Sequence, residues 1–173
     1  MTPIGTRGQA PLVPIALALD LMRHGDALPA AEGGDSARPL SRSGIRDLER
    51  LGLHLARLRW RPDRAFASPL ARARESAGIV LQHVPQMEIE SMEALLPERE
   101  PEDVIDALHD LDLTRGHVVL VGHQPLLGRL VAWLTGGESS SLPPGTLVRL
   151  ELEGPIARNS AKLAWVLRPE NVA

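Results

Sequence analysis

The chain has 173 residues, which is enough for one domain with a sizeable core and too few for two. Hydrophobic residues make up 43% and charged residues 24%, as in ordinary globular proteins, and no segment reaches the roughly 20 apolar residues that span a membrane. The formal charge of −3 argues against general nucleic-acid binding, which needs a basic excess. The absence of cysteine excludes disulfides, thiolate nucleophiles and cysteine metal sites, and it fits a cytoplasmic protein.

The first element follows a stretch rich in proline, glycine and polar residues, and we expect that stretch, residues 1–14, to be a disordered extension. A single domain would then cover residues 15–173. The apolar run from Ile15 to Met22 has the length of a buried parallel strand, and an arginine, a histidine and a glycine follow it directly. In open α/β sheets ligands bind beyond the carboxyl ends of the strands, so this tripeptide is placed to meet a substrate.

Two helices are expected in the next part of the chain. The first follows the loop over residues 27–40 and is capped by Ser41 or Ser43. The second follows a short strand at residues 65–67, with a serine as its N-cap and a proline as its first helical residue, at positions 68 and 69. This places Arg72 in the first turn, where backbone donors and the positive end of the helix dipole favour an anion.

The second half of the chain continues the alternation of strand and helix. Its expected elements are a strand, a helix, an apolar strand, a helix and two final strands, at residues 87–92, 102–113, 117–121, 125–135, 146–152 and 163–167. The alternation predicts an α/β domain of three layers, with a mostly parallel sheet flanked by helices on both faces. The last two strands are expected to form an antiparallel hairpin or edge pair.

Residues that can bind and transfer an anion follow three of the predicted strands: Arg23 with His24, Arg72, and His123. Because parallel strands end at the same edge of a sheet, two arginines and two histidines are expected around one crevice. Phosphate matches the guanidinium forks best, and a histidine beside it can attack phosphorus in line. Two arginines would repel a cation, so no metal is expected. The remaining histidines are expected to be structural or exposed: His54, His83, His109 and His117.

Three blocks of this sequence resemble, in order, the signatures of the histidine phosphatase superfamily, also called phosphoglycerate-mutase-like: residues 22–25 (Met-Arg-His-Gly), 68–73 (Ser-Pro-Leu-Ala-Arg-Ala) and 121–125 (Val-Gly-His-Gln-Pro). The resemblance covers almost the whole chain after the first 14 residues and implies the phosphoglycerate-mutase-like fold. Within the superfamily, the short length, the Arg-His-Gly-Asp-Ala opening, the Arg-Pro-Leu-Ser approach to the first helix and the nearby Leu-Pro-Glu block resemble SixA-type phosphohistidine phosphatases.

The resemblance implies a role for each residue of the predicted crevice. His24 would be the nucleophile that carries the phosphoryl group as a transient phosphohistidine. Arg23 and Arg72 would hold the phosphate oxygens, and His123 would donate a further hydrogen bond to them. Gly25 would let the backbone turn and let the ligand approach closely. No metal or other cofactor is implied, because the arginines and histidine supply the charge that magnesium supplies elsewhere.

Glu98 is the candidate general acid, since it resembles the glutamate that protonates the leaving oxygen in branches that cleave phosphate esters. The alternative is an ordinary loop or helix-cap carboxylate. An imidazole leaving group is far less basic than an alkoxide and can take its proton from solvent, so the need for an enzyme acid is smaller.

The resulting hypothesis is a monomeric cytoplasmic phosphatase that removes phosphate from phosphohistidine in a partner protein, such as a phosphocarrier or a histidine-containing phosphotransfer domain of a signal-transduction pathway. The short chain lacks the long insertions that would form a lid, which suits a protruding side chain. One alternative is a phosphatase of a small sugar or nucleotide phosphate. Another is a phosphate-binding regulatory module without catalytic activity. No nucleic-acid or membrane partner is expected.

Overall fold

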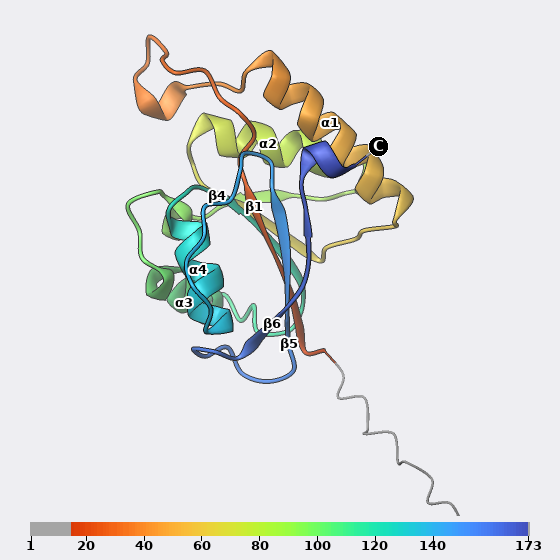
Figure 1. Ribbon diagram of the computed structural model, residues 1–173, viewed down its shortest axis with the longest axis vertical. Coiled ribbons are helices and arrows are strands. Elements are labelled where there is room, and N and C mark those ends of the chain that lie inside the picture. Colours follow the sequence, from red (N-terminus) through yellow and green to blue (C-terminus); the bar gives the residue numbers. More distant parts are fainter. Residues whose placement is uncertain (1–14, 173) are drawn as a thin grey trace, which may run out of the picture.

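The computed structural model describes residues 15–172, so the predicted extension at residues 1–14 lies outside the described part (Figure 1). The helices and strands are, in chain order, β1 (Leu17–Arg23), α1 (Arg42–Arg57), β2 (Arg64–Ala67), α2 (Ala71–Leu81), β3 (Ile89–Ser91), α3 (Pro101–Asp110), β4 (Gly116–Gly122), α4 (Leu126–Thr135), β5 (Leu147–Leu152) and β6 (Ala161–Leu167). Short 3-10 helices are η1 (Asp35–Ala37), η2 (Glu93–Leu95) and η3 (Pro169–Asn171). Across residues 15–172, no helix combines the length and apolar character that a membrane crossing requires.

The six strands form one sheet in the order β3-β2-β4-β1-β5-β6. The first four strands in this order are parallel, while β5 runs antiparallel to both β1 and β6. The predicted mostly parallel α/β sheet with a final antiparallel pair is therefore confirmed. Strands β2, β4 and β1 are neighbours, so the strand ends that carry the predicted site residues lie side by side.

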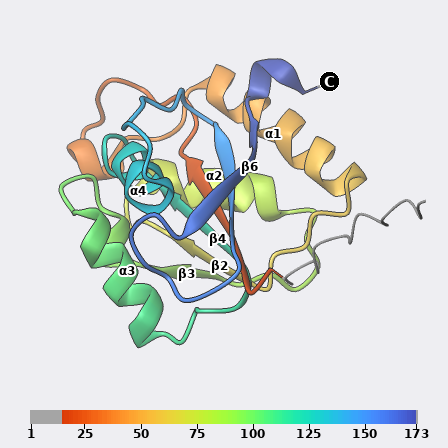
Figure 2. The same cartoon turned by 60° about the horizontal axis from the view of Figure 1, so that its bottom comes forward.

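Helices cover both faces of the sheet, with α3 and α4 on one side and α1 on the other (Figure 2). Alternate residues of β1 enter different cores because successive side chains of a strand point to opposite faces. Leu19 and Leu21 belong to the core under α3 and α4, whereas Met22 belongs to the core under α1 and α2. Burial on both faces holds β1 rigidly and thereby positions the polar residues at its end.

The second helix begins later than predicted. α2 starts at Ala71 with Leu70 as its N-cap, and no side chain caps it. The hydroxyl of Ser68, expected to be the cap, instead lies 2.8 Å from Nε2 of His123. Arg72 still falls in the first turn, as predicted. The first helix begins as expected, with Ser41 Oγ accepting a hydrogen bond from the backbone N–H of Gly44.

The loop between β1 and α1 is anchored at both ends. An isolated bridge pairs Ala27 with Leu40, and the Ser41 hydroxyl donates to Oδ2 of Asp26 over 2.5 Å. Arg38 Nε donates to the carbonyl oxygen of Leu28, 2.6 Å away, which ties the two sides of the loop together. Residues 27–40 therefore form a compact rim beside the end of β1.

Candidate active site

The two site histidines come from adjacent strands. β1 pairs with β4 in a register that sets Arg23 opposite Gly122, and the backbone N–H of His24 donates to the Gly122 carbonyl over 3.0 Å. The residue that follows β4 is His123, whose ring centroid lies 5.0 Å from that of His24. The parallel pairing of two distant segments thus brings together the histidines that the sequence places 99 residues apart, at positions 24 and 123.

His24 is held as a neutral imidazole with a free nitrogen. Its Nδ1 lies 2.7 Å from the carbonyl oxygen of Gly25, and because a carbonyl only accepts, Nδ1 carries the proton. The lone pair is therefore on Nε2. Burial, together with the charges of Arg72 and Arg23, outweighs this hydrogen bond and lowers the pKa of His24 to about 4. At neutral pH the ring is uncharged and nucleophilic.

His123 is also neutral, and its Nδ1 has no hydrogen-bond partner within residues 15–172. Burial and the neighbouring His24 lower the pKa of His123 to about 3. Ser68 Oγ accepts from the backbone N–H of Leu70 at 3.4 Å, and within residues 15–172 the acceptor for its own proton is Nε2 of His123, 2.8 Å away. In this tautomer Nδ1 carries the hydrogen. That buried atom has no partner among the described residues, so it remains available to an anion.

Arg23 contributes a second unused donor. Its Nη1 donates to the carbonyl oxygen of Leu142 over 2.6 Å, which fixes the half-buried guanidinium in place. Its Nε is buried and has no partner within residues 15–172. Leaving such a donor unpaired costs free energy, so Arg23 Nε and His123 Nδ1 both mark a place for a ligand acceptor.

Arg72 is 5% exposed and already holds an anion from the chain itself. Its Nη1 donates to the backbone carbonyl of Asp35 over 2.8 Å, and its Nη2 lies 3.1 Å from Oδ2 of the same residue. The other carboxylate oxygen of Asp35 accepts from Arg38 at 2.8 Å. Both outer nitrogens of Arg72 are therefore occupied by the loop that precedes α1.

Sequence reasoning missed four residues around this site. Ser68 was expected as a helix cap, and Asp35 was not singled out within its loop. Ser76 accepts from the Gly25 N–H and donates to the Arg72 carbonyl, and its position four residues after Arg72 was a signal that both share a helix face. Thr146 is fully buried with an unpartnered hydroxyl, and its carbonyl accepts from the N–H of Arg23.

Gly25 is required by packing. A Cβ atom at this position would lie 2.7 Å from Cδ1 of Leu48, so a larger residue would press on the core under α1. Its φ is not in the left-handed region, and thus tight contact with Leu48, more than an unusual turn, accounts for glycine here.

Glu98 is not joined to the site by any contact. It lies exposed in the turn between η2 and α3, and within the described residues its carboxylate makes no hydrogen bond or ion pair. The helix-cap role falls to a different residue, Glu100, which forms a capping box with Asp103 at the start of α3.

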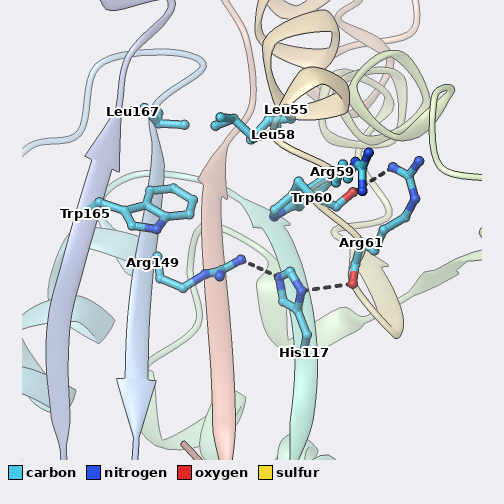
Figure 3. Close-up of a pocket in the computed structure, with 9 residues that line it drawn as sticks. All are labelled: Leu55, Leu58, Arg59, Trp60, Arg61, His117, Arg149, Trp165 and Leu167. Carbon is cyan, nitrogen blue, oxygen red and sulfur yellow. Dashed lines mark hydrogen bonds between the residues drawn. The ribbon is translucent and has the colours of Figure 1, made fainter.

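A cavity of about 410 Å³ lies away from these residues, between the end of α1 and strands β4 to β6 (Figure 3). Beneath it is the fully buried Asp20, which accepts hydrogen bonds from Trp60, His117 and Arg149. Figure 3 shows His117 between Arg149 and Arg61, and Arg149 also lies 4.8 Å from the Trp165 ring. Burial acts to raise the pKa of Asp20, but the bonds from Arg149 and His117 bring it below its usual value. This network joins β1, β4 and β5 to the segment that follows α1.

No group of three or more metal-ligating side chains occurs in the part of the chain that the structure describes. The residues at the strand ends instead present cations and hydrogen-bond donors, a set suited to a phosphate-like oxyanion. The structure is a phosphoglycerate-mutase-like α/β fold in which arginines and histidines gather beside the carboxyl ends of the parallel strands.

Comparisons with known proteins find similarity to one family over part of the chain. The model of the histidine phosphatase superfamily (branch 1) matches residues 19–100, and no curated protein matches in sequence. Over residues 19–100 the chain is similar to the histidine phosphatase superfamily.

Solved structures show the same similarity. The protein histidine phosphatase SixA complexed with tungstate superimposes with a TM-score of 0.77 and 26% identity, over 89% of this chain and 98% of that one. A SixA protein of Agrobacterium tumefaciens superimposes with a TM-score of 0.73 and 24% sequence identity, over 88% of this chain and 97% of that one. The alpha-ribazole phosphatase of Shigella flexneri superimposes with a TM-score of 0.68 and 19% sequence identity, over 90% of this chain and 98% of that one. The latter two likenesses establish the fold alone.

Proposed function

We propose that this protein is a phosphatase that forms a phosphohistidine at His24, and that its substrate is a phosphohistidine side chain of a partner protein in a phosphotransfer pathway. The observation that carries the proposal is the neutral His24 ring, with Nε2 free, beside two unused buried donors. A nucleophile and an unfilled oxyanion site then stand next to each other.

The first step transfers the phosphoryl group. The lone pair on His24 Nε2 attacks phosphorus, the bond from phosphorus to the substrate nitrogen breaks, and the leaving imidazole keeps that electron pair and takes a proton from solvent. Arg23 Nε and His123 Nδ1 donate to the phosphoryl oxygens, and Arg72 neutralises a further charge. In the second step water attacks phosphorus, His24 leaves as neutral imidazole, and inorganic phosphate is released.

The carboxylates around the site favour a leaving group that needs little acid assistance. Asp35 bonds to Arg38 and Arg72, which keeps its pKa below the usual value and makes it a poor proton donor. Glu98 remains the candidate acid from the family resemblance, and it lies in an exposed turn. The similarity to SixA, whose structure holds the tetrahedral oxyanion tungstate, also favours phosphohistidine over an ester.

The test uses a histidine-containing phosphocarrier phosphorylated with phosphoramidate. Wild-type protein is mixed with it, quenched in alkali to preserve phosphohistidine, and mapped by mass spectrometry. We expect label at His24 and loss of hydrolysis in His24→Ala. His109→Ala is the matched control, because that histidine is exposed on α3. No label at His24, with unchanged hydrolysis in His24→Ala, would refute the mechanism. Faster turnover of a sugar or nucleotide phosphate would refute the substrate.

A further inference from the structure

We propose that Asp35 sets the affinity of the phosphate site by acting as a tethered competitor: its carboxylate occupies the Arg72 guanidinium, and a phosphoryl group must displace it. The inference rests on the proposed function only in assuming that Arg72 binds phosphate. It adds a residue that neither the family resemblance nor the neighbouring structures assign.

The contacts of Arg72 are those that a bound phosphate would make. A guanidinium presents parallel N–H donors that match two oxygens of one anion. In Arg72 both outer nitrogens are used by a single residue, through the backbone oxygen of Asp35 at 2.8 Å and its Oδ2 at 3.1 Å. A phosphate can take these two N–H donors only when the Asp35 contacts break.

The two reactive histidines are buried in the structure. His24 is 8% exposed and His123 is 1% exposed, although a phosphoryl group has to reach both. The Asp35 side chain is 61% exposed and that of Arg72 is 6% exposed, so Asp35 can return to solvent when a phosphate replaces it as the partner of the buried guanidinium. The cost of moving it is therefore small.

Arg38 gives the displaced carboxylate a partner. Oδ1 of Asp35 accepts from Arg38, while Oδ2 faces Arg72, so the two ion pairs use different oxygens. When phosphate takes Arg72, the pair with Arg38 can persist, and Arg38 stays attached to the loop through Leu28. The electrostatic attraction of Arg23 and Arg72 is stronger for a doubly charged phosphoryl group than for a singly charged carboxylate. This difference favours the exchange of Asp35 for phosphate.

The test measures phosphate binding directly. Inorganic phosphate is titrated into the wild-type protein, Asp35→Asn and Glu32→Gln by isothermal titration calorimetry at neutral pH. Glu32 is the matched control, since it is an exposed acid of the same loop with no hydrogen-bond or ion-pair partner within residues 15–172, and its change removes the same charge. We expect the Kd of Asp35→Asn to fall roughly fivefold below that of Glu32→Gln, the scale of one partly exposed ion pair.

The outcomes separate this inference from the proposed function. An unchanged or higher Kd in Asp35→Asn would overturn the competitor role and show that Asp35 only positions Arg72. Arg72→Ala is titrated in parallel and is expected to abolish binding. If Arg72→Ala does not bind phosphate but the Kd of Asp35→Asn is not lower than that of Glu32→Gln, only the competitor role of Asp35 is refuted. If Arg72→Ala still binds phosphate, the anion site itself is misplaced. Thermal melts confirm that each variant is folded.

Discussion

The imidazole rings of His24 and His123 lie 5.0 Å apart and tilted by 57°, and each ring depends on a different partner for its tautomer. The Gly25 carbonyl leaves Nε2 of His24 without a proton, whereas the Ser68 hydroxyl leaves Nδ1 of His123 with one. A nucleophile and a hydrogen-bond donor thus stand side by side, although both are the same residue type.

The pH dependence of phosphoryl transfer follows from the neutral state of His24. Because burial lowers the pKa of His24 to about 4, its reactive form persists as the pH falls from 7 to 5 and is lost only near pH 4. We expect the single-turnover rate of labelling to stay level above pH 5 and to halve near pH 4. Circular dichroism over the same range checks that the protein stays folded. A midpoint near 6.5 would show that His24 is solvated in the reacting state.

Replacing Arg72 by alanine removes a charge from the transferring phosphoryl group. We expect kcat/KM to fall roughly 10²-fold or more, as when one preorganised oxyanion donor is lost. Arg74→Ala is the control, because Arg74 is exposed on the same helix and its removal changes the net charge equally. Similar rates in the two variants would mean that Arg72 does not contact the phosphoryl group.

Ser68→Ala tests whether the serine hydroxyl sets the tautomer of His123. The variant loses one hydrogen bond at a buried ring, worth about 1 kcal/mol, and we expect kcat/KM to fall roughly fivefold. Nitrogen-15 NMR of the ring gives a direct readout: the proton on Nδ1 should dominate in the wild type and lose that dominance in Ser68→Ala. Ser43→Ala, in an exposed part of the chain, should change neither measurement. A wild-type ring protonated on Nε2 would contradict the assignment.

Asp20→Ala tests the buried network beside the second cavity. The change leaves Arg149 partly buried without its carboxylate, and we expect the free energy of unfolding to fall by about 3 kcal/mol, with kcat/KM unchanged. The folded pKa of Asp20 lies below its usual 3.8, so this stabilisation is present above pH 4 and is lost as the pH falls through the folded value.

Urea unfolding at pH 7 and at pH 3 measures this difference. The gap between wild type and Asp20→Ala should narrow at the lower pH. Asp106→Asn is the control, because Asp106 is exposed on α3. A change below 1 kcal/mol at pH 7 would show that Arg149 and His117 find other partners when Asp20 is absent.

Most of the fold could be predicted from local pattern. The apolar runs that became β1 and β4 end at Arg23 and Gly122, one residue from the expected boundaries, because burial on both faces requires continuous apolar residues. Parallel strands end at a common edge, which is why the sequence alone predicts that Arg23, His24, Arg72 and His123 lie close together.

The partners of these side chains could not be predicted, because they depend on contacts between distant parts of the chain. The local sequence around Ser68 predicts a helix cap, yet Ser68 forms a hydrogen bond with His123, which lies 55 positions later in the chain. Asp35 is one of several polar loop residues, yet it reaches Arg72 across 37 positions. Residue types and periodicity specify where strands end and which chemistry they carry. The tautomers, the unused donors and the occupied guanidinium arise only when packing sets each polar atom against a particular partner.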